Sequence, residues 1–264
     1  RALKTGKRAG VATLLVAAAL AVFSTGQARA AEGPGSVVSM KPESGAPPGT
    51  KAWRVLYRST GLKDEPIEVS GLVIVPVLPA PPGGCPILAW ALPTSGLIDK
   101  CAPSLSSMRF LQIAGLADML ARGYVVAATD YPGLGTPGVH PYLVGTSEGR
   151  AVLDSIRAAA AIAEETTINA ALWGHSQGGH AALFAAKMAP TYAPDINLKG
   201  VAVAAPATDL ARLLAEDEPT PGGKTLLAMT LWSWAHVFGA PIEKVVDPAA
   251  MPVVDKLAND CLET

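Results

Sequence analysis

Five residues in the middle of the chain have the types and spacing of a nucleophilic serine site. Residues 174–178 read Gly-His-Ser-Gln-Gly. A Gly-x-Ser-x-Gly pentapeptide can hold its serine on a sharp turn between a strand and a helix, because its small neighbours allow strained backbone geometry and expose the hydroxyl. An apolar segment, 170–173, enters the motif, and an alanine-rich segment, 178–188, leaves it. This context favours Ser176 as a nucleophile over the alternative, a glycine-rich turn with an incidental serine.

Such a nucleophile needs hydrogen-bond donors for the negative charge that develops on the attacked carbonyl oxygen. The backbone amide of Gln177, directly after the serine, is the first candidate. The second donor should come from the loop that follows an earlier central strand, and residues 92–96 occupy that place. We expect Thr94, or else Ser95, to donate there. The alternative is an ordinary turn.

Further polar residues follow the apolar run 124–129. Asp130 comes directly after this run, where the ends of parallel strands gather functional side chains. We expect Asp130 to hold a loop by accepting backbone hydrogen bonds, and Tyr131 to line the pocket. His140 and Tyr142 lie in the loop that follows, either near the site or at the surface.

An α/β scaffold has to position these residues. Short, continuous apolar runs are typical of strands buried on both faces of a parallel sheet, and the chain has four, at 85–92, 124–129, 170–174 and 200–205. Helical patterns at 105–122 and 147–165 alternate with them, the second beginning at a capping-type Thr-Ser-Glu. Before them, 53–59 and 66–76 read as an antiparallel strand pair, and 32–48 as a leader without a core. The predicted fold class is α/β with a mostly parallel sheet.

Three segments divide the chain. Residues 1–30 carry basic residues, an apolar run at 11–23 and Ala-Arg-Ala at 28–30, which predicts a signal peptide cleaved near Ala30 and export; a retained anchor is the alternative. We predict an α/β core at 31–206. Residues 207–264 offer amphipathic helices at 209–215, 224–237 and 251–258 without a further buried strand, which predicts a helical cap.

Composition agrees with an exported globular protein. The 264 residues are 50% hydrophobic and 16% charged, which excludes a disordered chain. The predicted signal removes five of the 21 basic residues and none of the 22 acidic ones, so the remainder carries a net charge of −6. A nucleic-acid partner is therefore not expected. The scattered histidines and cysteines show no metal-ligand spacing, and no nucleotide-binding loop is present, so no cofactor is predicted.

Three cysteines in an exported chain permit one disulfide. Cys101 and Cys261 lie in contexts typical of loops or helix ends, whereas Cys85 enters an apolar run. We expect the first two to pair and Cys85 to be buried. Three unpaired thiols remain the alternative.

Together, residues 173–180, 130–150 and 101–104 resemble the secretory lipase family of α/β hydrolases, the fungal lipase A type and its bacterial relatives. The resemblance covers most of 50–264. It implies a secreted serine carboxylic ester hydrolase that acts on lipid esters of the triacylglycerol type, or on small esters, through an acyl-enzyme on Ser176 in lipid catabolism. It also implies a helical cap and a disulfide from Cys101 to a cap cysteine, which matches Cys261. One departure is Leu92-Pro93-Thr94 where bacterial relatives usually show His-Gly-Thr. Thr94 keeps the expected donor position, and Pro93 lacks only an amide that is not assigned as a donor.

The acid and histidine of a serine triad follow the nucleophile in this fold. Only His180 and His236 follow Ser176 here, and His180 lies on the predicted helix after the serine. The sequence therefore predicts a chain truncated inside its cap, lacking the triad acid and histidine, with His236 as a weak fallback. The competing interpretation is a non-catalytic secreted binding protein, or inactive fragment, that retains the serine turn. Stable membrane insertion after signal cleavage is not expected.

Overall fold

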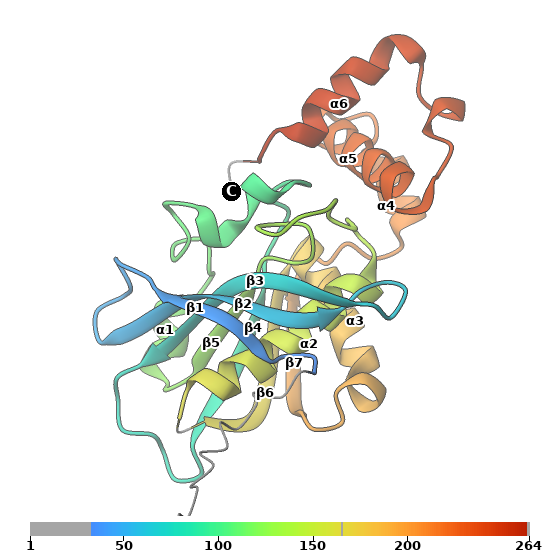
Figure 1. Ribbon diagram of the computed structural model, residues 1–264. Coiled ribbons are helices and arrows are strands. Elements are labelled where there is room, and N and C mark those ends of the chain that lie inside the picture. The colour runs from blue at the N-terminus through green and yellow to red at the C-terminus, as the bar shows by residue number, and fades with distance from the viewer. Residues whose placement is uncertain (1–32, 165, 263–264) are drawn as a thin grey trace, which may run out of the picture.

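A seven-stranded sheet forms the centre of the molecule (Figure 1). The computed structural model describes residues 33–164 and 166–262, so the predicted signal peptide lies outside the described residues. The strands lie in the order β1-β2-β3-β5-β4-β6-β7. Their bounds are β1 Val37–Pro42, β2 Thr50–Thr60, β3 Pro66–Pro76, β4 Cys85–Ala91, β5 Val125–Thr129, β6 Thr166–His175 and β7 Asn197–Ala204.

The sheet is antiparallel in one half and parallel in the other. β1, β2 and β3 pair antiparallel, as do β3 and β5, whereas β5, β4, β6 and β7 are parallel neighbours. Gly71 makes the junction of the halves possible, since a Cβ there would press on the Ala128 carbonyl of β5. The predicted α/β class and the antiparallel pair of β2 and β3 are confirmed.

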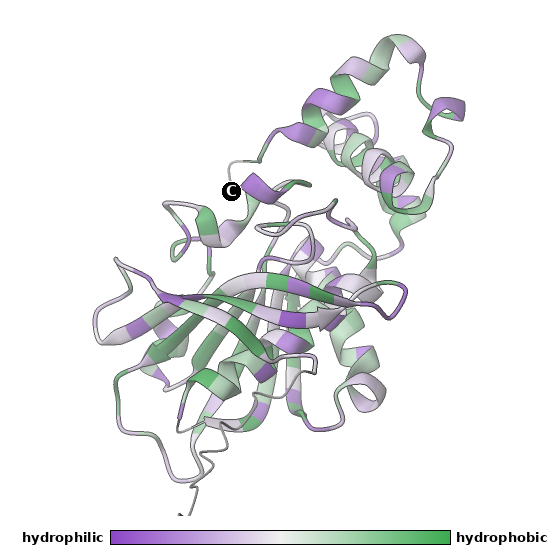
Figure 2. Ribbon diagram, in the orientation of Figure 1, coloured by the Kyte–Doolittle hydropathy of each residue, from purple (hydrophilic) through white to green (hydrophobic). Residues whose placement is uncertain are grey.

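The continuous apolar runs of β4 and β5 lie where the sheet is covered on both faces. Every residue of β5 is buried, as is every residue of β4 except Pro86. The hydrophobic colour of Figure 2 is concentrated on the central strands for this reason. Burying such branched and aromatic side chains contributes the main favourable free energy of folding.

Helices cover both faces of the sheet. α1 (Leu116–Ala121) contacts β5 and β3, while α2 (Gly145–Ile162) and α3 (Gln177–Tyr192) pack against each other and against the parallel strands. The chain moves from β4 to β5 in one direction and from β6 to β7 in the other. Right-handed crossovers in opposite directions put their helices on opposite faces, so the point at which the strand order reverses lies at the ends of β4 and β6.

Three helices follow β7, as the helical patterns predicted, namely α4 (Leu210–Asp217), α5 (Pro221–Phe238) and α6 (Met251–Asn259), and this group of helices is named the cap for its position. It lies above the carboxyl ends of the parallel strands (Figure 1). Its apolar cluster is separate from that of the sheet, and it includes Met229 and Trp232 of α5 together with Tyr142 and Leu143 of the loop below. The apolar side chains of α5 in this cluster therefore form the hydrophobic core of the cap.

A disulfide joins the cap to the core. Cys101 pairs with Cys261 across 160 residues, which confirms the predicted pairing, and Cys85 is buried on β4. Next to it, the amide of Leu262 donates to the Ser95 carbonyl at 2.9 Å. The end of the cap is thus fixed to the loop that follows β4.

Three local predictions were wrong. Residues 37–42 of the predicted leader form the edge strand β1, which the sequence conceals because five of its six residues are exposed. The helix expected at 105–122 is only α1, because Gly115 adopts a left-handed φ of 78° and separates α1 from the turns before it. β7, expected to be buried on both faces, is exposed along most of its length because it is an edge strand.

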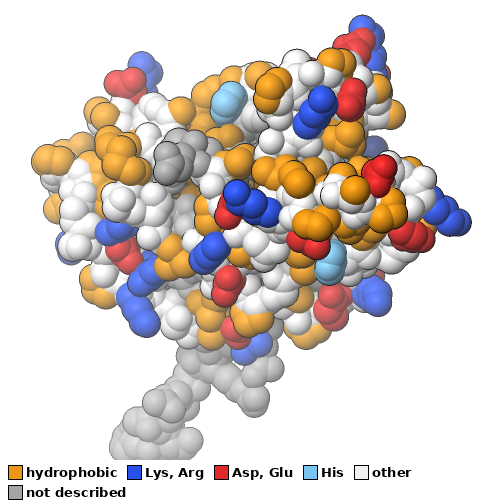
Figure 3. All heavy atoms as spheres, turned by 90° about the horizontal axis from the view of Figure 1, so that it is seen from above, with side chains coloured by type: hydrophobic (Ala, Val, Ile, Leu, Met, Phe, Trp, Pro, Cys, Tyr) orange, Lys and Arg blue, Asp and Glu red, His pale blue; other side chains and the backbone are white. Residues whose placement is uncertain are grey.

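The surface carries no dominant charge on the face that Figure 3 shows from above, where acidic and basic side chains are interspersed among apolar ones. None of the helices in the described ranges is both long and apolar enough to span a bilayer.

Candidate active site

Ser176 occupies a strained turn between β6 and α3. Its φ of 55° and ψ of −120° lie in a region that non-glycine residues rarely adopt. Three backbone hydrogen bonds hold it there: its amide donates to Ala204 at 2.9 Å, and its carbonyl accepts from His180 at 3.1 Å and from Ala207 at 3.3 Å. The side chain is partly exposed and its hydroxyl makes no capping bond to α3. This is the geometry expected of a serine nucleophile.

The glycines of the pentapeptide are required by close packing. A Cβ on Gly174 would collide with the Gly178 carbonyl, and a Cβ on Gly178 would collide with the Ala91 carbonyl at the end of β4. A Cβ on Gly179 would lie 2.9 Å from the Cα of Pro206. The first turn of α3 therefore sits directly against the ends of β4 and β7.

The two expected amide donors lie on neighbouring segments. Gln177 begins α3, where first-turn amides have no partner within the helix. The loop that carries Thr94 follows β4, whose last residue, Ala91, is in register with Gly174 of β6. The Thr94 hydroxyl lies 2.9 Å from the Tyr142 hydroxyl, and the Tyr131 hydroxyl donates to the Leu92 carbonyl at 2.9 Å. Two tyrosines thus support this loop.

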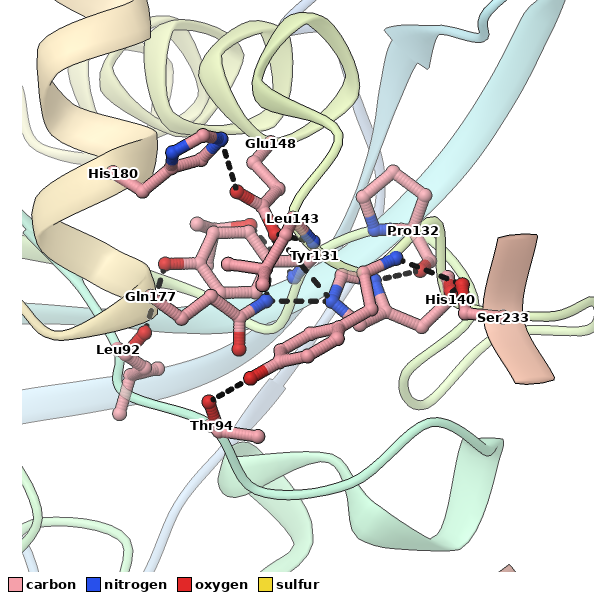
Figure 4. Close-up of polar contacts among 12 residues, drawn as sticks. Leu92, Thr94, Tyr131, Pro132, His140, Leu143, Glu148, Gln177, His180 and Ser233 are labelled. Atoms are coloured by element: carbon pink, nitrogen blue, oxygen red, sulfur yellow. Dashed lines mark hydrogen bonds and ion pairs between the residues drawn. The ribbon is translucent and has the colours of Figure 1, made fainter. Parts of the chain in front are cut away.

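Beneath the turn, the side chain of Gln177 is buried in a polar network (Figure 4). Its Nε2 lies 2.7 Å from Nε2 of His140 and donates to Oε1 of Glu148 at 2.7 Å. His140 in turn lies with Nδ1 2.9 Å from the Pro132 carbonyl. Both His140 and Glu148 have no exposed surface. The network connects α3, α2 and the loop after β5.

Burial controls the ionisation of this network. It lowers the pKa of His140 to about 4, with partial compensation from the Pro132 carbonyl. It raises the pKa of Glu148 to about 8, although the hydrogen bonds from Gln177 and Leu143 act in the opposite direction. Both shifts favour the neutral side chain, because burial penalises charge.

Asp130 performs the scaffolding role predicted for it. It is fully buried and accepts hydrogen bonds from the amide of Ser104 at 2.8 Å, from the Ser104 hydroxyl at 2.5 Å and from the Ser70 hydroxyl at 2.6 Å. Burial raises the pKa of this carboxyl, and the three bonds oppose that rise. Asp130 fastens the segment after the disulfide residue Cys101 to the sheet.

No described histidine is hydrogen-bonded to the Ser176 hydroxyl. His180 lies with Nδ1 2.8 Å from the Ala207 carbonyl, and His175 is exposed. The fallback base, His236, stacks on Trp232 with its Nδ1 2.8 Å from that residue's carbonyl. It lines a cleft of about 380 Å³ beside the β2–β3 turn, and Ser176 is not among the residues that line this cleft. The contacts found for the His236 ring are thus with Trp232 and not with Ser176.

Sequence reasoning missed the role of Glu148. It read this residue as part of a helix cap, whereas α2 begins at Gly145 without a side-chain cap and Glu148 turns into the core. The sequence placed His140 and Tyr142 either near the site or at the surface, and the structure shows both side chains buried near Gln177 and Thr94. Pairing of a buried acid with a glutamine 29 residues away leaves no local pattern. Within the described ranges, no three potential ligand side chains gather into a metal site.

Comparison with known proteins identifies the architecture. The chain is similar to Candida antarctica lipase A in its closed state, with a TM-score of 0.71, 20% identity and coverage of 87% of this chain and 56% of that one. It is similar to the rice cell wall degrading esterase LipA from Xanthomonas oryzae, with a TM-score of 0.71, 20% identity and coverage of 85% and 66%. These similarities show an α/β-hydrolase fold.

Sequence relatives agree. A probable inactive lipase of Mycobacterium tuberculosis is 32% identical over 178 residues, which is 62% of this chain and 39% of that protein. A probable trichothecene esterase of Stachybotrys chartarum is 28% identical over 77% of this chain and 43% of its own length. The chain thus spans less than half the length of these relatives. The model of the secretory lipase family matches residues 105–264. With this match over more than half of its length, the chain belongs to the secretory lipase family.

Proposed function

We propose that this chain carries the nucleophile of an exported serine hydrolase that cleaves carboxylic esters of lipids or small alcohols. Ser176 Oγ would attack the ester carbonyl, and the ester C–O bond would break so that the alcohol leaves with the serine proton and an acyl-enzyme remains. Water would then hydrolyse the acyl-enzyme to the carboxylic acid and restore the serine hydroxyl. The observation that carries the proposal is the strained backbone of Ser176 between β6 and α3. Such strain persists only where the surrounding structure holds it, and it is concentrated at functional sites.

The oxyanion that forms on the carbonyl would be held by the amides of Gln177 and Thr94. Gln177 lies at the start of α3, where the helix dipole also favours negative charge. Thr94 lies on the neighbouring loop, which Tyr131 and Tyr142 support from below. Each such donor is typically worth a few kcal/mol in the transition state. The signal peptide at 1–30 would direct the protein out of the cell.

A second function has a specific observation in its favour. The Ser176 hydroxyl has no histidine bonded to it in the described part of the chain, and one relative is named as a probable inactive lipase. A serine hydroxyl without a base is a poor nucleophile near neutral pH. The alternative is therefore a non-catalytic secreted protein that keeps the turn and binds a ligand at it.

Covalent labelling separates the two functions. A fluorophosphonate probe should modify the purified chain at Ser176, as peptide mass spectrometry would show, and Ser176→Ala should abolish the adduct. Hydrolysis of p-nitrophenyl esters, measured in parallel, should depend on the same residue. A chain that stays unlabelled at high probe concentration while remaining folded would instead support the binding protein.

The variant His236→Ala is the matched control in this experiment. Because the His236 ring packs on Trp232 beside a different cleft, we expect the variant to be labelled at the wild-type rate. Loss of labelling in a folded His236→Ala protein would assign the base to His236 and contradict the placement described above.

A further inference from the structure

Glu148, in the first turn of α2, has two oxygens with different surroundings. Oε1 accepts the Leu143 amide at 3.0 Å and Nε2 of Gln177 at 2.7 Å. Oε2 is buried and has no hydrogen-bond partner within the described chain. An unpartnered buried carboxylate oxygen is costly, so its surroundings indicate which protonation state the fold accommodates.

The hydrogen bonds around Gln177 assign Oε1 as an acceptor only. The Pro132 carbonyl can only accept, so Nδ1 of His140 carries the proton. Nε2 of that ring then accepts a hydrogen bond from the side-chain amide of Gln177. The second amide hydrogen of Gln177 then goes to Oε1 of Glu148. With two N–H donors at Oε1, a proton on this carboxyl has its place on Oε2.

His180 supplies the partner on the other side. Its Nδ1 donates to the Ala207 carbonyl at 2.8 Å, so Nε2 carries a lone pair. This Nε2 is buried without a partner and lies 4.0 Å from Oε2 of Glu148 (Figure 4). If the carboxyl were ionised, two lone-pair atoms would face each other. One proton between them removes that conflict.

No positive side chain compensates a charge at this position. The titratable groups around Glu148 are His180 from α3 and Tyr131, His140 and Tyr142 from the loop after β5. Neither a lysine nor an arginine forms an ion pair with this carboxyl in the described residues. A buried carboxylate in such surroundings would lose its hydration without gaining a counter-ion.

We propose that Glu148 is a positioning residue for the Ser176 turn and that it acts as a neutral acid, with its Oε2 proton directed at Nε2 of His180. Through Oε1 it fixes the side chain of Gln177, and the backbone amide of this same residue is the proposed oxyanion donor. On its other side it faces His180, whose Nδ1 donates to the Ala207 carbonyl, and the amide of Ala207 donates to the Ser176 carbonyl. The positioning role rests on the proposed function, whereas the neutral acid does not.

The pKa directions agree with this arrangement. Burial raises the pKa of Glu148 to about 8, and burial lowers the pKa of His180, an effect that the nearby backbone of Ala207 and Leu143 partly offsets. Near neutral pH both side chains are then uncharged. The proton remains on the carboxyl and does not pass to the imidazole.

Infrared difference spectroscopy tests the neutral acid without requiring activity. The wild-type protein should show the carbonyl stretch of a protonated carboxylic acid near neutral pH, and the band should disappear as the pH rises past about 8. Glu148→Gln should lack the band, while Glu218→Gln, which makes the same chemical change at an exposed site, should retain it. No band at neutral pH would show an ionised Glu148, held by a bridging water or by protonated His180, and would overturn the proposal.

Fluorophosphonate labelling tests the positioning role. Glu148→Gln presents an amide N–H to His180 where the acid presents its proton, so it should keep the labelling rate within a few-fold of wild type at about pH 6. Glu148→Ala removes both contacts and should slow labelling on the order of tenfold. At about pH 9.5 the wild type, now ionised, should fall behind Glu148→Gln.

The outcomes separate the two proposals. If the wild type shows the infrared band but is never labelled, the proposed function fails and the neutral acid stands. If Glu148→Gln is labelled as slowly as Glu148→Ala while both remain folded, the neutral acid is not what positions the turn. Equal labelling of all three proteins at every pH would exclude any positioning role.

Discussion

At the scale of single residues, the site is defined by buried polar groups that remain uncharged. His140 has no exposed surface and keeps one proton on Nδ1 for the Pro132 carbonyl, while its Nε2 accepts from Gln177. Protonation of Nε2 would replace this acceptor with a donor that faces the Gln177 amide group. The network therefore depends on a neutral imidazole, which its burial favours.

We predict that acid weakens the fold through His140. Its pKa in the folded protein is about 4, below the value of 6.5 for an ordinary histidine, so the unfolded chain binds the proton more readily. The stabilisation is present above about pH 6.5 and is lost as the pH falls toward 4, by about 3 kcal/mol in total. Urea unfolding of wild type and His140→Gln between those pH values should show it.

The comparison with the variant isolates this residue. Because Glu148 titrates in the opposite sense, the total stability of the wild type is not the relevant quantity. The difference between wild type and His140→Gln should fall with decreasing pH. A difference that stays constant from pH 6.5 to 4 would contradict the assignment.

At the scale of elements, Ser176 is positioned by the approach of α3 to the strand ends. Gly178 lies so close to the Ala91 carbonyl that no side chain fits between α3 and β4. This contact brings the first amides of α3 beside the loop that carries Thr94. The paired ends of β4 and β6 are therefore each followed by a segment that carries a proposed donor.

Gly178→Ala should separate these two segments. The added methyl would collide with backbone and not with a flexible side chain, so α3 must shift. We expect a loss of roughly 1–3 kcal/mol in unfolding free energy and a fall of at least about tenfold in labelling of Ser176.

Gly222→Ala, on α5, provides the matched control for this substitution. A Cβ at that position meets nothing within 4 Å, so both its stability and its labelling should stay close to wild type. Thermal unfolding and labelling kinetics would be measured for the two alanine variants together. Wild-type labelling in Gly178→Ala would show that the close approach is unnecessary.

At the scale of the whole molecule, the cap has a small apolar core of its own and is tied to the rest by the disulfide. The cap cluster contains nine buried residues, and four of these, Leu97, Tyr142, Leu143 and Ala207, belong to loops outside the cap helices. Cys261 fixes the end of the cap beside Ser95, on the loop proposed to carry an oxyanion donor. The disulfide and this hydrogen bond therefore join the end of the cap to the loop of the proposed site.

Replacing both Cys101 and Cys261 by serine should loosen the cap before the sheet. A disulfide that closes so long a loop is typically worth roughly 2–4 kcal/mol, a large share beside the small apolar cluster and the few hydrogen bonds that otherwise join the cap to the loop below. Limited proteolysis should cut first within residues 207–262 in the double variant. Equal resistance in both proteins, or first cleavage within the sheet, would show that the cap is held by its packing alone.

The sequence by itself determined the elements whose patterns are local. The continuous apolar runs predicted the buried strands, the amphipathic spacing predicted the cap helices, and the pentapeptide placed Ser176 between a strand and a helix. It predicted the disulfide from context and resemblance. It failed to find β1, whose mostly exposed residues lack the alternation by which strands are recognised. It found β7 from its apolar run but predicted it to be buried, whereas its place at the edge of the sheet leaves it exposed.

Only the tertiary structure decided what surrounds the serine. Glu148, His140 and Gln177 come from three separate segments, and their protonation states follow from burial and from one another's hydrogen bonds. The Gly178 contact with β4 and the stacking of His236 on Trp232 are likewise products of packing. The spacing of hydrophobic residues and the residue types of a turn depend only on residues that are close in sequence. Burial and hydrogen bonding between distant segments exist only once the chain has folded.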